Sequence, residues 1–203
     1  MDNEKIEEIE SKIEYTFRNK KNLIKAFTHA SASNENKDPY GNYEDLAKFG
    51  DRILNFIVSD KLYLMGRINE IETGHERKNN YINNENIMKR AKALGIEPIS
   101  SFLVLGEGSK SDPNIDQSEK IYGDVIEALI AAIYIDSGRN LNKARRFILE
   151  KLEVIEIDQE ARLRALERIN DDSTMNIKKL KGYDPKQFPH DVIDFNAEAK
   201  NKE

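Results

Sequence analysis

The stretch IYGDVIEALIAAIYIDSG, residues 121–138, decides the fold of this chain. It consists mainly of Ile, Val, Leu, Ala and Tyr, and the DSG at its end stops the pattern, so it predicts a helix buried in the interior. Two acids, Asp124 and Glu127, interrupt the apolar run three residues apart. On a helix this spacing puts both carboxylates on one face, about 5–6 Å apart between Cβ atoms. Because a buried charge is costly without a partner, we expect a counter-charge or a metal ion beside them.

The other periodic segments also predict helices, and no hairpin signal or alternating pattern occurs, so the expected fold class is all-α. Turn-rich sequence at 33–42 and 105–119 separates the helices. Besides the central helix, we expect helices over residues 3–13, 19–31, 43–65, 76–94 and 140–152. In the longest of them, the residues expected to face the core are Leu46, Phe49, Ile53, Phe56 and Ile57.

Length and composition indicate one domain with an appended segment. The chain has 203 residues, of which 38% are hydrophobic and 34% charged, and its formal net charge is −5. We expect a domain over residues 1–155, then a helical and loosely ordered polar extension over 156–203. Cysteine is absent, which excludes disulfides and thiolate metal sites. No run reaches the ~18 apolar residues that span a bilayer, so we expect a soluble cytoplasmic protein without membrane contact.

The helix predicted over 43–65 carries a second pair of acids. Glu44 and Asp51 are seven residues apart and share one face, with Ala47 between them. If this helix packs on the central one, the four acids form an all-oxygen site suited to Mg²⁺ rather than zinc. The alternative is that these acids lie on solvated faces or in structural salt bridges. Asp45, Lys48 and Arg52 occupy a different face and are expected to form ordinary solvated ion pairs.

Two further residues near these motifs have structural explanations. Gly50 is expected to let another helix approach closely, at some cost in helix propensity. His29 is expected to be a hydrogen-bonded structural residue rather than a metal ligand.

Four motifs in register resemble the ribonuclease III family. YEDLAKFGD (43–51) resembles its signature, in which a Glu, and a second Glu three residues on, precede a Gly-Asp pair. GDVIEALIAAIYIDSG (123–138) resembles its second acidic motif. YTFRNKKNLIKAFTHASAS (15–33) and LVLGEGSKS (103–111) complete a likeness that covers about residues 5–152.

The resemblance implies an all-helical, homodimeric endonuclease domain that cleaves double-stranded RNA to 5′-phosphate and 3′-hydroxyl ends. It implies that Mg²⁺ or Mn²⁺ is held by Asp51, Asp124 and Glu127, with Glu44 as the fourth catalytic acid in a less direct role. The GEGSKS loop falls where the family has residues close to RNA. The expected RNA contacts of this loop are Gly106, Gly108, Ser109 and Lys110.

Ala47 stands where the family pattern has its second metal-binding Glu. Three explanations of Ala47 are open. It is an engineered substitution, or a natural variant of the motif, or the chain is a non-catalytic member that keeps the fold as an RNA-binding or scaffold protein. We expect a catalytic ancestry with impaired activity, because losing one ligand costs on the order of 10–100-fold.

The residues after Leu152 do not match the double-stranded-RNA-binding domain of typical members. The basic cluster KKLKGYDPK (178–186) predicts at most a minor phosphate contact through Lys178 and Lys179, and a solvated linker is the alternative. RNA would then be bound mainly by the dimer's own surface. The apolar run LNFIV (54–58) is expected to be exposed unless a second copy covers it.

Overall fold

Helices make up nearly all the regular structure in the computed structural model of this chain, which describes residues 1–35, 39–65 and 81–155. Within these ranges there is no strand, and Thr28 and Val104 form an isolated parallel bridge. The described residues all belong to one compact unit, Met1–Ile157. The predicted all-α fold class is therefore confirmed. The predicted domain boundary after residue 155 stays a prediction, because residues 156–203 lie outside the described ranges.

The helices agree with the sequence pattern in order and approximate position. Short helical turns connect them, and the last turn, η5, is π-helical. The α-helices are α1 (Asn3–Ile13), α2 (Lys20–Ala26), α3 (Glu44–Leu64), α6 (Asn84–Ala93), α7 (Glu119–Asp136) and α8 (Leu141–Arg146). The turns are η1 (Ala30–Glu35), η2 (Ile99–Ser101), η3 (Glu107–Ser109), η4 (Ile115–Gln117) and η5 (Phe147–Lys151).

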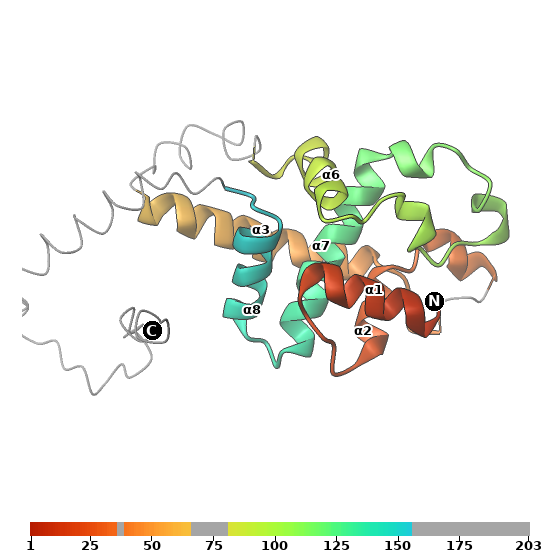
Figure 1. Ribbon diagram of the computed structural model, residues 1–203, viewed down its shortest axis with the longest axis horizontal. Helices are drawn as coiled ribbons and strands as arrows, with labels where there is room; N and C mark the ends of the chain where they lie inside the picture. The colour runs from red at the N-terminus through yellow and green to blue at the C-terminus, as the bar shows by residue number, and fades with distance from the viewer. Residues whose placement is uncertain (36–38, 66–80, 156–203) are drawn as a thin grey trace, which may run out of the picture. The chain divides into compact units, whose positions relative to one another are not determined.

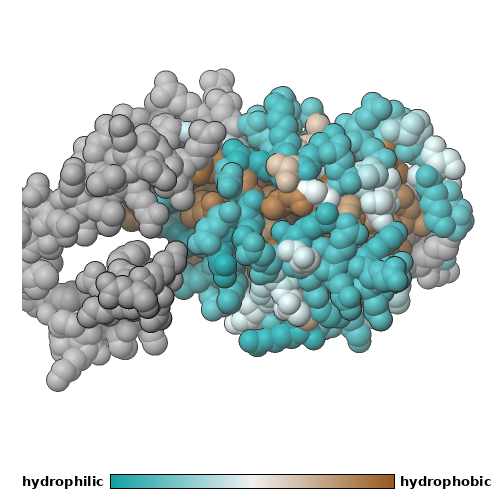
Figure 2. Space-filling view, viewed as in Figure 1, coloured by the Kyte–Doolittle hydropathy of each residue, from teal (hydrophilic) through white to brown (hydrophobic). Residues whose placement is uncertain are grey.

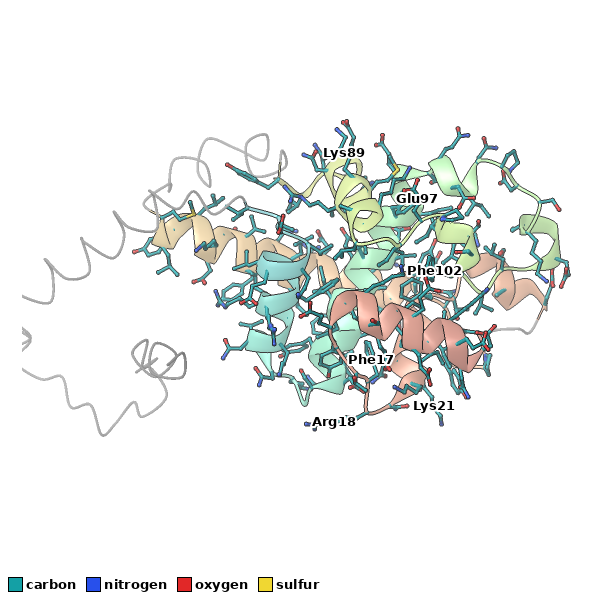
Figure 3. All side chains as sticks on the ribbon, in the orientation of Figure 1. Phe17, Arg18, Lys21, Lys89, Glu97 and Phe102 are labelled. Carbon is teal, nitrogen blue, oxygen red and sulfur yellow. The ribbon has the colours of Figure 1, made fainter. Side chains whose placement is uncertain are left out.

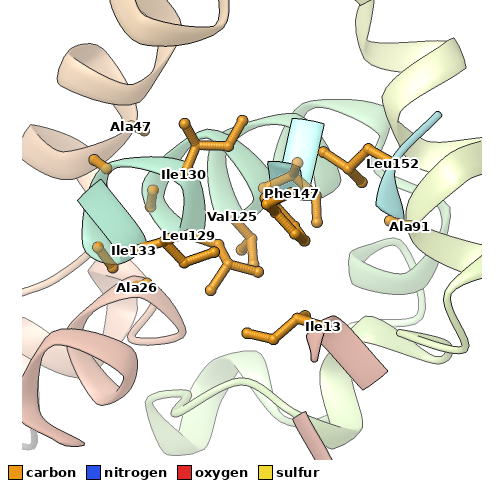
Figure 4. Packing of buried hydrophobic residues seen from close by; sticks show 14 of the residues in the cluster. Ile13, Ala26, Ala47, Ala91, Val125, Leu129, Ile130, Ile133, Phe147 and Leu152 are labelled. Carbon is orange, nitrogen blue, oxygen red and sulfur yellow. The ribbon is translucent and has the colours of Figure 1, made fainter. Parts of the chain in front are cut away.

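Helix α7 is the buried centre of the unit, as its sequence predicts. Ser118 caps it, because the Oγ atom accepts a hydrogen bond from the backbone N–H of Ile121 at 3.3 Å. Gly138, with a φ of 75°, follows its last turn. Helices α2, α3, α6 and α8 all pack against α7, which passes through the middle of the described helices (Figure 1). Apolar side chains from α1, α2, α3, α6 and η5 surround it (Figure 4), which explains why most of its side chains are buried.

Helix α3 packs against α7 through one face and exposes the other. Leu46, Ile53 and Ile57 are buried as predicted. The prediction that Phe49 and Phe56 also face the core is wrong, because they are 40% and 55% exposed. These two residues lie seven positions apart, about two turns, on one exposed side of the helix, and Phe49 contacts Tyr134 of α7 at the margin of that side.

The run LNFIV was expected to be exposed in a single copy, and this is wrong for most of it. Leu54, Ile57 and Val58 are buried in the chain's own core, whereas Phe56 is exposed. Exposed apolar residues instead occur along α3, mainly at seven-residue intervals, and together form what we call the apolar stripe. The apolar stripe consists of Phe49, Phe56, Tyr63 and Leu64.

The helix predicted over 19–31 is shorter than expected. It ends at Ala26 because the following residues leave the helix to pair with Val104. The N–H of Val104 donates to the carbonyl oxygen of Phe27 at 2.9 Å, and the N–H of His29 donates to that of Val104 at 3.0 Å. This bridge ties the segment before α3 to the loop that leads into η3.

The helix predicted over 76–94 is described from residue 81 onward. Its main part, α6, begins after Asn83, whose Oδ1 accepts a hydrogen bond from the N–H of Asn86 at 2.8 Å. Gly95, with a φ of 78°, follows its end as predicted. Residues 76–80 lie outside the described ranges.

Hydrophilic residues cover most of the described surface on the face shown in Figure 2. In the described ranges, no helix combines the length and the apolar character that crossing a bilayer would require.

Candidate active site

Gly50 lies where α3 crosses α7. A Cβ atom at this position would collide with the backbone carbonyl group of Glu127, so only glycine permits this approach. The expectation that Gly50 lets another helix come close is therefore confirmed. The crossing brings Asp51, the residue after Gly50, to the same place as Glu127.

A pocket of about 370 Å³ opens at this crossing. The four predicted acids all line it, Glu44 and Asp51 from α3 and Asp124 and Glu127 from α7. Ala47 lines it as well, but it is only 4% exposed and belongs to the core cluster, among whose side chains Figure 4 shows it. The position without a carboxylate is therefore part of the pocket wall.

Glu127 is a partly buried acid among other acids. Burial, and then the negative charges of Asp51 and Asp124, raise its pKa from 4.5 to about 8 against the opposing charge of Lys120. Within the described residues, only burial and neighbouring charges act on the pKa of this carboxyl group. In the pocket as it stands Glu127 is mostly protonated at neutral pH, and its ionised form needs additional positive charge nearby.

Asp51 is oriented by a neighbour that the sequence interpretation missed. The Nδ2 atom of Asn55 donates to Oδ1 of Asp51 at 2.6 Å and to its backbone oxygen at 2.8 Å. The Nε atom of Arg52 lies 3.9 Å from Oδ2 of the same carboxylate. The four-residue spacing between Asp51 and Asn55 is a signal that could have identified this pair.

Positive side chains share the pocket with the acids. The expectation that Lys48 and Arg52 lie on a different face from the acids is wrong, because both line the pocket. Arg52 is solvated as expected, since its side chain is 83% exposed. Asp45 forms a solvated ion pair as expected, with Lys25, whose Nζ lies 2.7 Å from its Oδ2. Long basic side chains reach around a helix in this way, which spacing alone does not show.

His29 is held near the pocket. Burial lowers its pKa, the acids Glu44 and Asp124 oppose that shift, and Lys120 adds to it. Its Nδ1 lies 2.8 Å from the Oγ of Ser31, and its ring packs edge-on against Tyr43 at a centroid distance of 5.7 Å. The expectation of a hydrogen-bonded structural residue is confirmed.

The loop predicted to approach RNA lies apart from the acids. The N–H of Gly106 donates to the Oγ of Ser31 at 3.1 Å, and Lys110 pairs with Glu107 at 2.8 Å. The other predicted contacts, Lys178 and Lys179, lie outside the described ranges. The RNA-contact role of the loop and of these two lysines stays a prediction. The pocket lining includes none of the four predicted loop residues, Gly106, Gly108, Ser109 and Lys110.

The donors in the pocket suit a hard divalent cation in kind, because they are carboxylate oxygens. In the part of the chain that the structure describes, however, no group of three or more acidic or imidazole side chains is arranged to hold a metal ion. Ala47 contributes no ligand between Glu44 and Asp51, and Lys120 already occupies one oxygen of Asp124. The acids share a pocket without forming a closed coordination shell.

Known proteins with similar sequences are ribonucleases. The chain is 31% identical over 142 residues to ribonuclease 3 of Caldanaerobacter subterraneus subsp. tengcongensis, which covers 70% of this chain and 60% of that protein. It is 32% identical over 161 residues to ribonuclease 3 of Aquifex aeolicus, which covers 78% of this chain and 66% of that protein. The chain thus spans about two thirds or less of these relatives' length.

The fold has a counterpart among solved structures. The nuclease domain of ribonuclease III from Campylobacter jejuni superposes with a TM-score of 0.60 at 26% identity, covering 75% of this chain and 95% of that domain. The family model described as Ribonuclease-III-like matches residues 19–154, which include every helix that lines the acid pocket. The chain therefore belongs to the ribonuclease-III-like family.

Proposed function

We propose that this chain is a divalent-metal-dependent endoribonuclease domain that cleaves double-stranded RNA to 5′-phosphate and 3′-hydroxyl ends. The observation that carries the proposal is the convergence of Glu44, Asp51, Asp124 and Glu127 on one pocket at the crossing of α3 and α7. A carboxyl group whose pKa is raised in such a pocket is typical of functional sites. Membership of the ribonuclease-III-like family supports the same reaction.

In this proposal Asp51, Asp124 and Glu127 hold Mg²⁺ or Mn²⁺, and Glu44 lies beside them at the start of α3. A bound cation supplies Lewis-acid chemistry and lowers the pKa of a coordinated water. Asn55 keeps one oxygen of Asp51 in a fixed orientation. Glu127 must give up its proton before it can act as a ligand, so metal binding is coupled to pH.

Ala47 sets the expected level of activity. Its methyl group lines the pocket between Glu44 and Asp51, so a longer acidic side chain there can reach the space that the other acids share. With alanine the pocket has one carboxylate fewer, and we expect weak metal binding and slow cleavage.

The test is cleavage of a long duplex RNA in Mg²⁺ by the chain and by its Ala47→Glu variant. We expect the rate to rise on the order of 10–100-fold in Ala47→Glu, because a ligand is added. Ala47→Gln is the matched control, since it has nearly the same size without the charge. Asp51→Asn or Glu127→Gln, introduced into Ala47→Glu, should abolish cleavage. A folded Ala47→Glu variant that leaves duplex RNA intact contradicts the proposal.

A second candidate is a non-catalytic RNA-binding or scaffold protein on the same fold. The pairing of Lys120 with Asp124 and the absence of a formed metal cluster among the described residues favour it. This candidate predicts RNA binding that is unchanged by EDTA and no gain of cleavage in Ala47→Glu.

We also propose that the chain forms a homodimer through the apolar stripe of α3. Phe56, Tyr63 and Leu64 are 55%, 63% and 65% exposed, and exposed apolar residues that gather on one face mark interaction surfaces. The loop at η3 and Lys178 and Lys179 remain proposed RNA contacts, since duplex RNA is bound largely through its 2′-hydroxyl and phosphate groups.

A further inference from the structure

A lysine reaches into the acid pocket beside one of the proposed metal ligands. Lys120 lies in the first turn of α7, and its Nζ is 2.5 Å from Oδ2 of Asp124, four residues further on. The side chain of Asp124 is 23% exposed, whereas that of Lys120 is 76% exposed. The carboxylate is therefore held by the fold, while the lysine reaches it from solvent and can leave without disturbing the core.

The charge of Lys120 acts on more than its partner. It lowers the pKa of Glu127 and also that of His29, and the lysine lines the pocket together with Lys48 and Arg52. Its ammonium group thus lies in the negative field of the acids, where a divalent cation would also be attracted.

Helix stability does not account for this ion pair. A cation in the first turn is repelled by the positive end of the helix dipole. A lysine placed four residues before an acid also stabilises a helix less than an acid placed four residues before a lysine. In α6 the acid comes first: the Nζ of Lys89 lies 2.6 Å from Oε1 of Glu85, four residues earlier. Lys89 projects outward from its helix (Figure 3). Of these two lysines, only Lys120 pairs with an acid of the pocket.

We propose that Lys120 is a built-in competitor of the divalent metal, pairing with Asp124 when no cation is bound and being displaced when a cation binds. The inference rests on the proposed function, because it takes the acid pocket as the metal site. Ala47 supports the inference. Three positive side chains, Lys48, Arg52 and Lys120, share the pocket with four acids, whereas a Glu at position 47 would make five. With fewer negative charges, each positive side chain opposes metal binding more effectively.

The test is Mn²⁺ binding to the full chain, measured by isothermal titration calorimetry at low ionic strength and at the same pH for every variant. We expect Lys120→Gln to bind Mn²⁺ about three- to tenfold more tightly, as removal of one charge near a divalent ion in a hydrated pocket implies. Lys89→Gln is the matched control and should bind as the unchanged chain does. In Asp124→Asn, the added Lys120→Gln change should have a smaller effect, because its partner is gone.

The outcomes separate this inference from the proposed function. If Asp51→Asn and Asp124→Asn abolish Mn²⁺ binding but Lys120→Gln leaves it unchanged or weaker, the competitor role is wrong and the metal site stands. If binding is absent in every variant, or is insensitive to the aspartates, both the competitor role and the metal site are wrong. A lysine that serves only to contact RNA would leave Mn²⁺ affinity unchanged and weaken RNA binding, which also contradicts the competitor role.

Discussion

Asp51, Asp124 and Glu127 line one pocket, but each carboxyl group has different neighbours. Asp51 accepts a hydrogen bond from Asn55, and Asp124 pairs with Lys120, so each of these two carboxylates has a polar partner. Glu127 has the charges of the other two acids nearby and a raised pKa. At the scale of single residues, Glu127 is therefore the acid of the metal-free pocket whose ionised form is opposed by burial and by its neighbours.

This difference predicts how the stability of the metal-free protein changes with pH. The folded-state pKa of Glu127, about 8, lies above its ordinary value of 4.5, so the folded state retains a proton that the unfolded state loses. The stability that this group contributes is complete below about pH 4.5 and is lost as the pH rises to about 8. Relative to Glu127→Gln, the chain should lose on the order of 3 kcal/mol of unfolding free energy between about pH 5 and pH 8.

Urea unfolding in EDTA, repeated at each pH, measures this difference. Glu127→Gln serves as the reference because it keeps the shape of the side chain and cannot titrate. If the unfolding free energies of the two proteins changed in parallel with pH, the pKa of Glu127 would not be raised in the folded state. Mn²⁺ added at about pH 8 should restore stability to the unchanged chain more than to the variant.

At the scale of helices, the site depends on the close crossing of α3 and α7. Gly50 permits that contact, and the acids of both helices reach the pocket because the backbones touch there. Asp124 and Glu127 lie on α7, whose other side chains are mostly buried, so the position of that helix is set by the whole core. Any change that separates the two helices should affect stability and the pocket together.

Gly50→Ala tests the crossing. The added methyl group meets backbone, which cannot turn aside as a side chain can, so we expect a loss of roughly 3 kcal/mol or more of unfolding free energy. Gly108→Ala is the matched control, because a Cβ there meets nothing within 4 Å, and it should change stability by about 0.5 kcal/mol or less. Urea unfolding measures both. Equal stability of the two variants would contradict the close contact.

At the scale of the whole molecule, the apolar stripe is the surface through which we propose that copies of the chain associate. The buried face of α3 serves the core of a single copy, while Phe56 and the other members of the apolar stripe remain exposed. The rings of Phe49 and of Tyr134 in α7 form a T-shaped pair at a centroid distance of 5.8 Å, so the apolar stripe begins beside the central helix. A second copy would cover this surface.

Phe56→Glu tests this association by analytical ultracentrifugation. We expect the unchanged chain to sediment as a dimer and Phe56→Glu as a monomer with unchanged helix content, because Phe56 is 55% exposed and its loss leaves the core intact. Tyr40→Glu is the control, since Tyr40 is an exposed aromatic residue outside the apolar stripe, and it should remain dimeric. A dimer that persists in Phe56→Glu would place the interface elsewhere.

The all-α fold class, the central helix and the two pairs of acids on common helix faces could be predicted from the sequence by itself, whereas their meeting in one pocket depended on how the two helices pack. Helical spacing puts Glu44 with Asp51, and Asp124 with Glu127, on common faces, and an apolar run as long as 121–136 must be buried. These are consequences of local geometry, which depends on residues three to seven positions apart. The same local order identified Gly50 as a point of close approach.

Only the tertiary structure decided what each side chain meets. Periodicity could not separate Phe49 and Phe56 from the core face of α3, because α7 covers a narrower strip of that helix than its apolar residues occupy. Nor could it show that Lys48, Arg52 and Lys120 reach the acid pocket, since long flexible side chains depart from the face on which their backbone lies. The raised pKa of Glu127 arises from burial and from charges on two helices, so it exists only once the chain is folded.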